Sequence, residues 1–147
     1  MAEAELKAWL ESYSSDTNDI YANYSDEKYE AYAAKYWAPD LNFIRPSGNP
    51  MGADGFKGMF SSGMIKDASS VLVSLDSVRL LGMLSCWPAA LPPPPGATVV
   101  CTYTTHDKFT YDGTVNDDIA KFSAVLEKGL GGWKATHIHR ATGQPPK

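Results

Sequence analysis

The segment near the C-terminus that could carry chemistry reads GGWKATHIHRATG, residues 131–143. It places His137 and His139 two residues apart, with Arg140 directly after them. Histidines at this spacing can bind a metal ion, act as an acid–base pair, or lie on a strand without a chemical role. With His106 they are the three histidines of the chain, enough for a three-histidine zinc site.

Strand alternation separates these histidines from the arginine. Successive side chains of a strand point to opposite faces. If Arg140 faces the interior, Thr136 and Ile138 share that face. His137 and His139 then lie on the outer face, at a subunit contact or at a pocket rim. This interpretation is favoured over a metal site, so no metal ion or cofactor is expected.

A buried arginine needs an anionic partner, because an unpaired charge in the interior is costly. For Arg140 that partner is either the carboxylate of a small ligand, held by two parallel hydrogen bonds, or an aspartate of the chain. Asp40 and Asp107 are the candidate internal partners. The spacing leaves both alternatives open.

The composition narrows the class of protein. A chain of 147 residues with a net charge of −4 and no cluster of lysine or arginine suits one globular domain and argues against nucleic-acid binding. No segment has the length of a transmembrane helix, and the acidic start lacks the pattern of a signal peptide, so we expect a cytoplasmic protein. Cys86 and Cys101 match no zinc spacing, and reduced thiols are favoured over a disulfide.

Two helices are expected within the first 40 residues. Apolar side chains at helical spacing mark the first helix: Leu6, Trp9, Leu10 and Tyr13. A polar stretch, SSDTND, follows it. Ser25 is typical of an N-cap and opens a second helix rich in aromatic residues, which Pro39 ends.

The remainder of the chain favours strands. A strand over 41–45, a turn at Pro46–Pro50 and a short helix with Phe56 precede them. Further strands are expected at 71–81, 99–111, 119–128 and 133–140. Asp112-Gly113 predicts a hairpin turn, and four consecutive prolines predict a stiff connection outside the sheet. Helices followed by antiparallel strands predict an α+β fold, in which the helices pack on the concave side of a curved sheet and enclose a pocket.

Three features together carry a family resemblance: the aromatic-ended helix before PDLNFIRPSGNPMGADGF, the long sheet, and the closing GGWKATHIHRATGQPP. The chain resembles the nuclear transport factor 2-like superfamily, which has a cone-shaped, cystatin-like α+β half-barrel. Within it the chain is similar to SnoaL-like proteins and to the association (hub) domain of calcium/calmodulin-dependent kinase II. The resemblance implies a single domain over 1–147, with 141–147 as a tail.

The resemblance also implies roles for individual residues. Arg45, before Pro46, stands where ketosteroid isomerases of the superfamily carry their aspartate base, and an arginine cannot act as a base at neutral pH. Arg140 is implied to point into the pocket, and Tyr103 and Thr105 to line it.

Tyr36, Trp37 and Asp40 complete the candidate ligand-binding residues. The two aromatic side chains can stack on a ligand, although core packing is the alternative. No nucleophile motif, phosphate loop or pair of carboxylates is evident.

We therefore expect a small homo-oligomeric pocket protein without catalytic activity, which binds a small acidic or aromatic molecule and assembles through its sheet face. The first alternative is an enzyme of the superfamily, either a proton-transfer isomerase or cyclase, or a metal-free carbonic anhydrase of the iota class. The second is a hub-like assembly scaffold. The fold alone does not decide between these functions.

Overall fold

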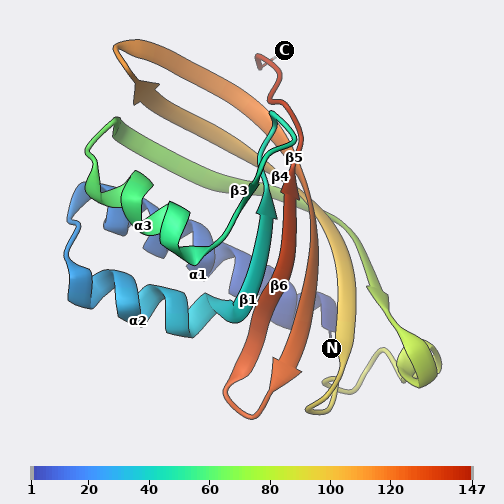
Figure 1. Ribbon diagram of the computed structural model, residues 1–147. Helices are drawn as coiled ribbons and strands as arrows, with labels where there is room; N and C mark the ends of the chain where they lie inside the picture. Colours follow the sequence, from blue (N-terminus) through green and yellow to red (C-terminus); the bar gives the residue numbers. More distant parts are fainter. Residues whose placement is uncertain (1, 147) are drawn as a thin grey trace.

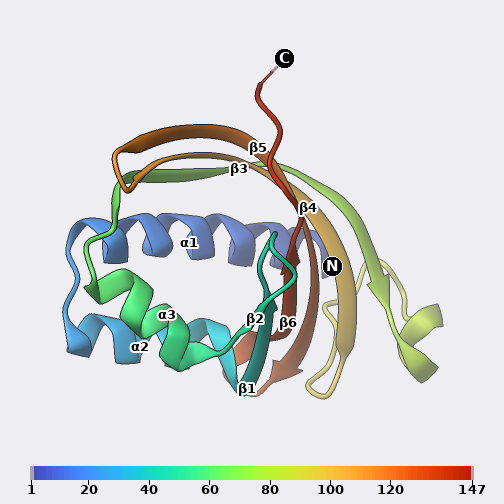
Figure 2. The ribbon, with the colours of Figure 1, turned by 45° about the horizontal axis from the view of Figure 1, so that its top comes forward.

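The computed structural model describes residues 2–146. Two helices come first, α1 (Ala2–Ala22) and α2 (Asp26–Tyr36), and a shorter helix, α3 (Ala53–Ser61), follows the second strand. Both views show these helices on one side of the sheet, inside its curve (Figure 1, Figure 2). No helix in the described part of the chain is long and apolar enough to cross a membrane.

The strands form a six-stranded sheet in the order β2-β1-β6-β5-β4-β3. Their bounds are β1 (Trp37–Ile44), β2 (Pro50–Met51), β3 (Ile65–Leu80), β4 (Thr98–Tyr111), β5 (Thr114–Gly129) and β6 (Gly132–Arg140). β1 and β6 run parallel, and the other neighbouring pairs are antiparallel. The predicted α+β fold, with N-terminal helices packed on a curved, mostly antiparallel sheet, is confirmed.

α1 continues through the polar stretch SSDTND instead of ending at it. Thr17 donates a hydrogen bond from its hydroxyl to the backbone oxygen of Tyr13 (2.6 Å), and its hydroxyl lies 2.7 Å from that of Tyr32. Ile20 is buried two helical turns beyond Tyr13, the last residue of the predicted apolar stripe. The polar side chains find partners inside the protein, so residues that usually favour helix ends remain helical here.

α2 begins as the sequence predicts. The hydroxyl of Ser25 accepts a hydrogen bond from the backbone N–H of Lys28 (3.1 Å), which satisfies a free donor of the first turn. The helix ends at Tyr36, and Trp37 already has the extended backbone of β1. Pro39 therefore lies within the strand, three residues beyond the end of the helix.

β3 is an edge strand and begins at Ile65 rather than at Val71. Asn18 of α1 protects part of its free edge. The Asn18 amide donates to the backbone oxygen of Ser70 (3.0 Å) and accepts from the Ser70 backbone N–H (2.7 Å). These two bonds imitate a neighbouring strand and cover an edge that would otherwise be open to another chain.

The connection from β3 to β4 lies outside the sheet, as the prolines predict. It contains the 3-10 turn η1 (Gly82–Cys86), which projects away from the helices (Figure 1). The connection is anchored at its far end, because Lys128 donates from Nζ to the backbone oxygen of Pro93 (2.7 Å) and to Oε2 of Glu5 (2.9 Å).

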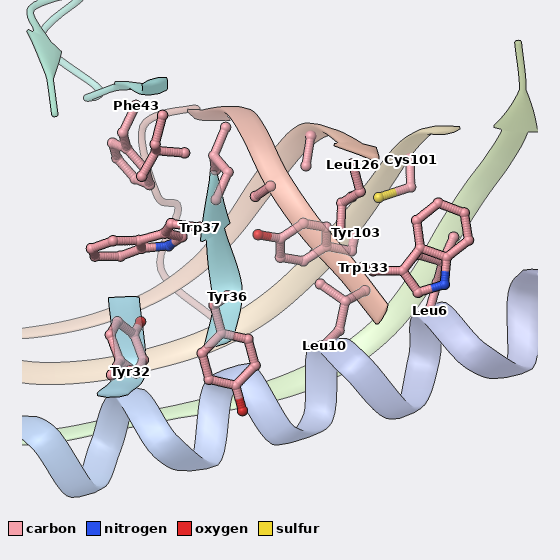
Figure 3. Packing of buried hydrophobic residues seen from close by; sticks show 14 of the residues in the cluster. Leu6, Leu10, Tyr32, Tyr36, Trp37, Phe43, Cys101, Tyr103, Leu126 and Trp133 are labelled. Atoms are coloured by element: carbon pink, nitrogen blue, oxygen red, sulfur yellow. The ribbon is translucent and has the colours of Figure 1, made fainter. Parts of the chain in front are cut away.

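The hydrophobic core lies between the helices and the concave face of the sheet (Figure 3). Its centre is aromatic: the ring of Trp37 lies 4.8 Å from that of Phe56 and 5.0 Å from that of Tyr32, measured between centroids. Cys101 is a free, fully buried thiol in this core, so no disulfide joins it to Cys86.

The tail after β6 packs along β5. The Ala141 N–H donates to the Lys121 backbone oxygen (2.9 Å), and Gln144 forms two backbone hydrogen bonds with Ile119. Gly143 between them allows a close approach, since a Cβ at that position would lie 2.5 Å from the Cβ of Asp118. The tail therefore holds Asp118 in place from the side opposite β4.

Candidate functional site

A cavity of about 270 Å³ lies between α1, α3 and the concave face of the sheet. Aromatic and methionine side chains dominate its wall. The members of this wall are Tyr13, Tyr21, Phe43, Met51, Phe56, Met59, Tyr103, Phe109 and Phe122. Its polar and charged lining comes from α1, β3, β4 and the ends of β1 and β6. The volume is near the lower limit of known ligand pockets, roughly 300–1,000 Å³, and suits a molecule of one or two rings.

A β-bulge decides which side chains of β6 face this cavity. Leu126 pairs with Ala135 and Val125 with His137, so Thr136 is an extra residue that no partner opposes. The bulge shifts the in–out alternation of side chains by one residue. Before the bulge the odd-numbered Trp133 and Ala135 face inward, and after it the even-numbered Ile138 and Arg140 do. Thr136 does not join the inner face, which corrects the sequence-based assignment of that side chain.

Arg140 lines the cavity and is paired within the protein. Its Nη2 lies 3.2 Å from Oδ2 of Asp107 and 3.9 Å from Oδ2 of Asp118. The hydroxyl of Ser70 donates to the other oxygen of Asp107 at 2.7 Å. The guanidinium also lies 5.8 Å from the centre of the Phe122 ring. Of the two alternatives that the sequence leaves open, the structure shows the internal ion pair, with Asp107 as the partner.

The two aspartates meet because of the hairpin between β4 and β5. Asp112 and Gly113 both have positive φ, 48° and 77°, as a two-residue turn of the I′ type requires. This turn sets a register in which Asp107 lies directly opposite Asp118. One guanidinium against two carboxylates leaves a formal charge of −1 at this end of the cavity.

Arg45 lies at the entrance of the same cavity. Its side chain is exposed, and its Nε donates to the backbone oxygen of Asn49 over a long distance of 3.4 Å. Within residues 2–146 it has no ion pair, in contrast to Arg140. Lys108 is also a lining residue, and its Nζ lies 4.0 Å from Oδ2 of Asp117, the aspartate that His106 contacts.

Tyr103 and Thr105 both line the cavity from β4. The ring of Tyr103 stacks on that of Phe122, with centroids 4.8 Å apart and planes within 3°. Burial raises the pKa of the Tyr103 phenol well above its ordinary value, so it stays neutral. The hydroxyl of Thr105 is buried and has no hydrogen-bond partner among the described residues.

Three of the candidate residues lie outside the cavity. Trp37 belongs to the aromatic core, and its Nε1 donates to the Tyr13 hydroxyl over 3.3 Å. Tyr36 lines a separate groove between the helices and the β5–β6 hairpin, and its hydroxyl donates to Asp16 (2.5 Å). Asp40 is exposed on β1 and does not pair with Arg140. For the two aromatic residues, the core alternative is the one that the structure shows.

The histidines lie away from the cavity. His139 is exposed and His137 half-buried, on either side of the fully buried Ile138. Nε2 of His106 lies 2.5 Å from Oδ1 of Asp117. In the part of the chain that the structure describes, no three His, Cys, Asp or Glu side chains are grouped so that they could hold a metal ion.

Two polar residues of the site were not foreseen. Ser70 has no distinguishing sequence signal, since it reaches Asp107 only through the pairing of β3 with β4. Asp118 had a signal, because a two-residue turn at Asp112-Gly113 places residues 107 and 118 opposite each other.

Comparison with known proteins agrees with this architecture. Residues 5–146 match the family described as Protein of unknown function (DUF3804). The search of curated proteins found no match.

An NTF2-like protein of unknown function from Prochlorococcus marinus is 28% identical, with a TM-score of 0.70 over 99% of this chain and 96% of that one. The CaMKII hub homology domain of Chlamydomonas reinhardtii is 19% identical, with a TM-score of 0.61 over 97% and 98%. A protein with a cystatin-like fold from Caulobacter vibrioides is 19% identical, with a TM-score of 0.59 over 97% and 89%. These likenesses confirm the nuclear transport factor 2-like fold that the sequence predicts.

Proposed function

The chain belongs to the family described as Protein of unknown function (DUF3804), and we propose that it binds a small aromatic molecule with an acidic group and does not catalyse a reaction. The observation that carries this proposal is the cavity itself. It combines a wall of aromatic and methionine side chains with Arg45, a cation at the entrance that has no ion pair within the described residues. Binding sites for small molecules typically combine an apolar wall with a few polar groups that fix orientation.

Arg45, rather than Arg140, is the proposed partner of the acidic group. Arg140 already faces two carboxylates, and a third anion beside them would be repelled by their net charge. Arg45 can offer both Nη groups of its guanidinium, since the one hydrogen bond of its side chain within residues 2–146 is long and uses Nε. The apolar body of the ligand then lies against the Tyr103–Phe122 pair.

Binding of 2-naphthoate, followed by its fluorescence, tests this proposal. Arg45→Gln should weaken binding roughly tenfold, because a charge-assisted hydrogen bond contributes about 1.5–3 kcal/mol. Lys108→Gln is the matched control, since it removes another exposed cation of a lining residue, one that already lies near the carboxylate of Asp117. Equal affinity of the wild type and Arg45→Gln for 2-naphthoate, or no binding by either, would refute the proposed role of Arg45.

A proton-transfer enzyme is the second candidate function, because the carboxylate of Asp107 lines the cavity. Both of its oxygens already accept a hydrogen bond within the protein, one from Ser70 and one from Arg140. Exchange of an acidic C–H proton of a bound aromatic ketone, followed by NMR, distinguishes the two functions. Exchange that the wild type accelerates and Asp107→Asn abolishes would overturn the non-catalytic proposal.

We further propose that the protein forms a homodimer or larger homo-oligomer through the outer face of its sheet, which carries His137 and His139. The fold likeness to a hub homology domain supports this, as does the polar, half-buried character of the face. Light scattering after gel filtration tests it. A monomer at all concentrations would refute it, whereas His139→Asp should shift an assembled protein toward monomer.

A further inference from the structure

Two adjacent threonines of β4 differ in whether their hydroxyl group has a hydrogen-bond partner. Thr104 and Thr105 are both buried, with 4% and 2% of their surface exposed. The Thr104 hydroxyl donates to Oδ2 of Asp76 at 2.7 Å and accepts a hydrogen bond from Lys121 on the outer face. Thr105 lines the cavity, and its buried hydroxyl has no partner among the described residues.

A buried hydroxyl without a partner is rare in proteins, because it has lost its hydrogen bonds to water and gained none. The Thr105 hydroxyl can donate one hydrogen bond and accept others. Thr105 lines the same cavity as Asp107, which lies two residues further along the strand and on the same face. A ligand that fills the cavity would therefore lie against the Thr105 side chain, beside a carboxylate.

The charges around Thr105 limit the chemical group that fits there. A carboxylate is disfavoured, because the cluster of Arg140 with Asp107 and Asp118 has a formal charge of −1. An ammonium group is disfavoured as well, because it accepts no hydrogen bond and would leave the Thr105 hydroxyl without an acceptor. A neutral hydroxyl fits both neighbours. It accepts from Thr105 and donates to Asp107, whose oxygens each retain a free lone pair.

The strand order fixes how far apart the polar groups of the ligand must be. Arg45 follows the end of β1, and Thr105 lies on β4, three strand spacings away across β6 and β5. At about 4.8 Å per spacing the two backbones are about 14 Å apart, measured along the curved sheet. The acidic group at Arg45 and the hydroxyl at Thr105 must therefore occupy opposite ends of the aromatic body.

We propose that the ligand is a hydroxylated aromatic acid, bound with its phenolic hydroxyl between Thr105 and Asp107 and its acidic group at Arg45. This inference rests on the proposed binding function, and it adds the hydroxyl group, its position on the ring system and the residue that selects it. Thr105 is then the residue that determines specificity.

Three naphthoates test the inference: 2-naphthoate, 6-hydroxy-2-naphthoate and 3-hydroxy-2-naphthoate. The wild type should bind the 6-hydroxy compound about ten times more tightly than 2-naphthoate, as expected for one added hydrogen bond in a dry site. The 3-hydroxy compound, whose hydroxyl is next to the acid, should gain nothing. Thr105→Val should abolish the preference, because valine keeps the shape and removes the hydroxyl.

Thr104→Val is the matched control on the opposite face of the strand, and it should retain the tenfold preference. Without ligand, only Thr104→Val should lower the melting temperature. Thr105→Val removes a hydroxyl with no partner, so its melting temperature should equal or exceed that of the wild type. Thr104→Val breaks the bonds to Asp76 and Lys121, so its melting temperature should fall.

The results separate the two proposals. If 2-naphthoate binds and the 6-hydroxy group adds no affinity, or if the 3-hydroxy isomer gains equally, the inference is overturned and the binding function stands. If Thr105→Val keeps the preference or lowers the melting temperature as much as Thr104→Val, Thr105 is not the selecting residue. If none of the naphthoates binds, both proposals are overturned.

Discussion

Replacement of Arg140 by methionine should destabilise the protein strongly although it leaves the core volume nearly intact. The long apolar side chain of methionine can follow the arginine stem past Phe122. What it removes is the positive charge that Arg140 places between Asp107 and Asp118, which lie directly opposite each other on β4 and β5. The variant therefore leaves two facing carboxylates without a counter-charge.

The expected loss can be scaled from the burial of the three side chains. Removing one member of a buried ion pair costs about 3–5 kcal/mol, whereas an exposed pair contributes about 1 kcal/mol or less. Here the exposed fractions are 17% for Arg140, 12% for Asp107 and 25% for Asp118. Because water still reaches these groups in part, we expect a loss near the lower limit for buried pairs, about 3 kcal/mol at pH 7.

Urea unfolding followed by the fluorescence of the four tryptophans measures this loss. Lys121→Met is the matched control, because Lys121 pairs with Asp76 at a similar distance of 3.2 Å but is 65% exposed, and it should cost about 1 kcal/mol or less. Adding Asp107→Asn to the Arg140→Met variant should recover part of the stability, since it removes one of the two repelling charges. Equal losses for Arg140→Met and Lys121→Met would show that the cluster is solvated like a surface pair and would refute the reasoning.

Three further predictions concern other parts of the fold. Burial by itself raises the pKa of Glu5, but hydrogen bonds from Lys128 and Trp133 hold this pKa below its usual value of 4.5. The Glu5 carboxylate therefore stabilises the fold above pH 4.5, and this stabilisation is lost as the pH falls through the pKa of Glu5 in the folded protein. Glu5→Gln should therefore be less stable than the wild type at pH 7, and the two urea midpoints should converge in acid; a constant difference would contradict this. Burial raises the pKa of the Cys101 thiol to about 11, so iodoacetamide at pH 8 should leave Cys101 unmodified in the native protein and alkylate it in urea, as mass spectrometry of peptides would show. Ser25→Ala removes the N-cap of α2 and should cost about 1 kcal/mol in the same urea assay, whereas Ser25→Gly should cost only a few tenths.

Local chemistry made much of the fold predictable. Ser25 caps a helix because its hydroxyl reaches a backbone N–H three residues away. Because the two residues are so close in the chain, the local sequence is enough to predict the cap. Asp112-Gly113 forms the hairpin for the same kind of reason, since both residues tolerate positive φ. That turn also sets the register that brings Asp107 opposite Asp118.

The identity of the cavity residues was less predictable, because core and pocket use the same residue types. Tyr36 and Trp37 have the size and apolar character of ligand-stacking groups, yet both lie outside the cavity. Their assignment depends on where α3 covers the sheet. The position of α3 follows from packing between distant segments, as in the contact of Trp37 with Phe56, so no local sequence pattern predicts it.

Local sequence signals predict the order of the helices and long strands, the cap, the hairpin turn and the likeness to the nuclear transport factor 2-like superfamily. Which face of β6 points inward depends on how the strands assemble. Simple alternation from the buried Trp133 would have placed His137 and His139 in the cavity, but the bulge at Thr136 reverses the phase and puts Arg140 there instead. A bulge depends on the fit between β6 and β5 over several residue pairs, so its position is a property of the assembled sheet.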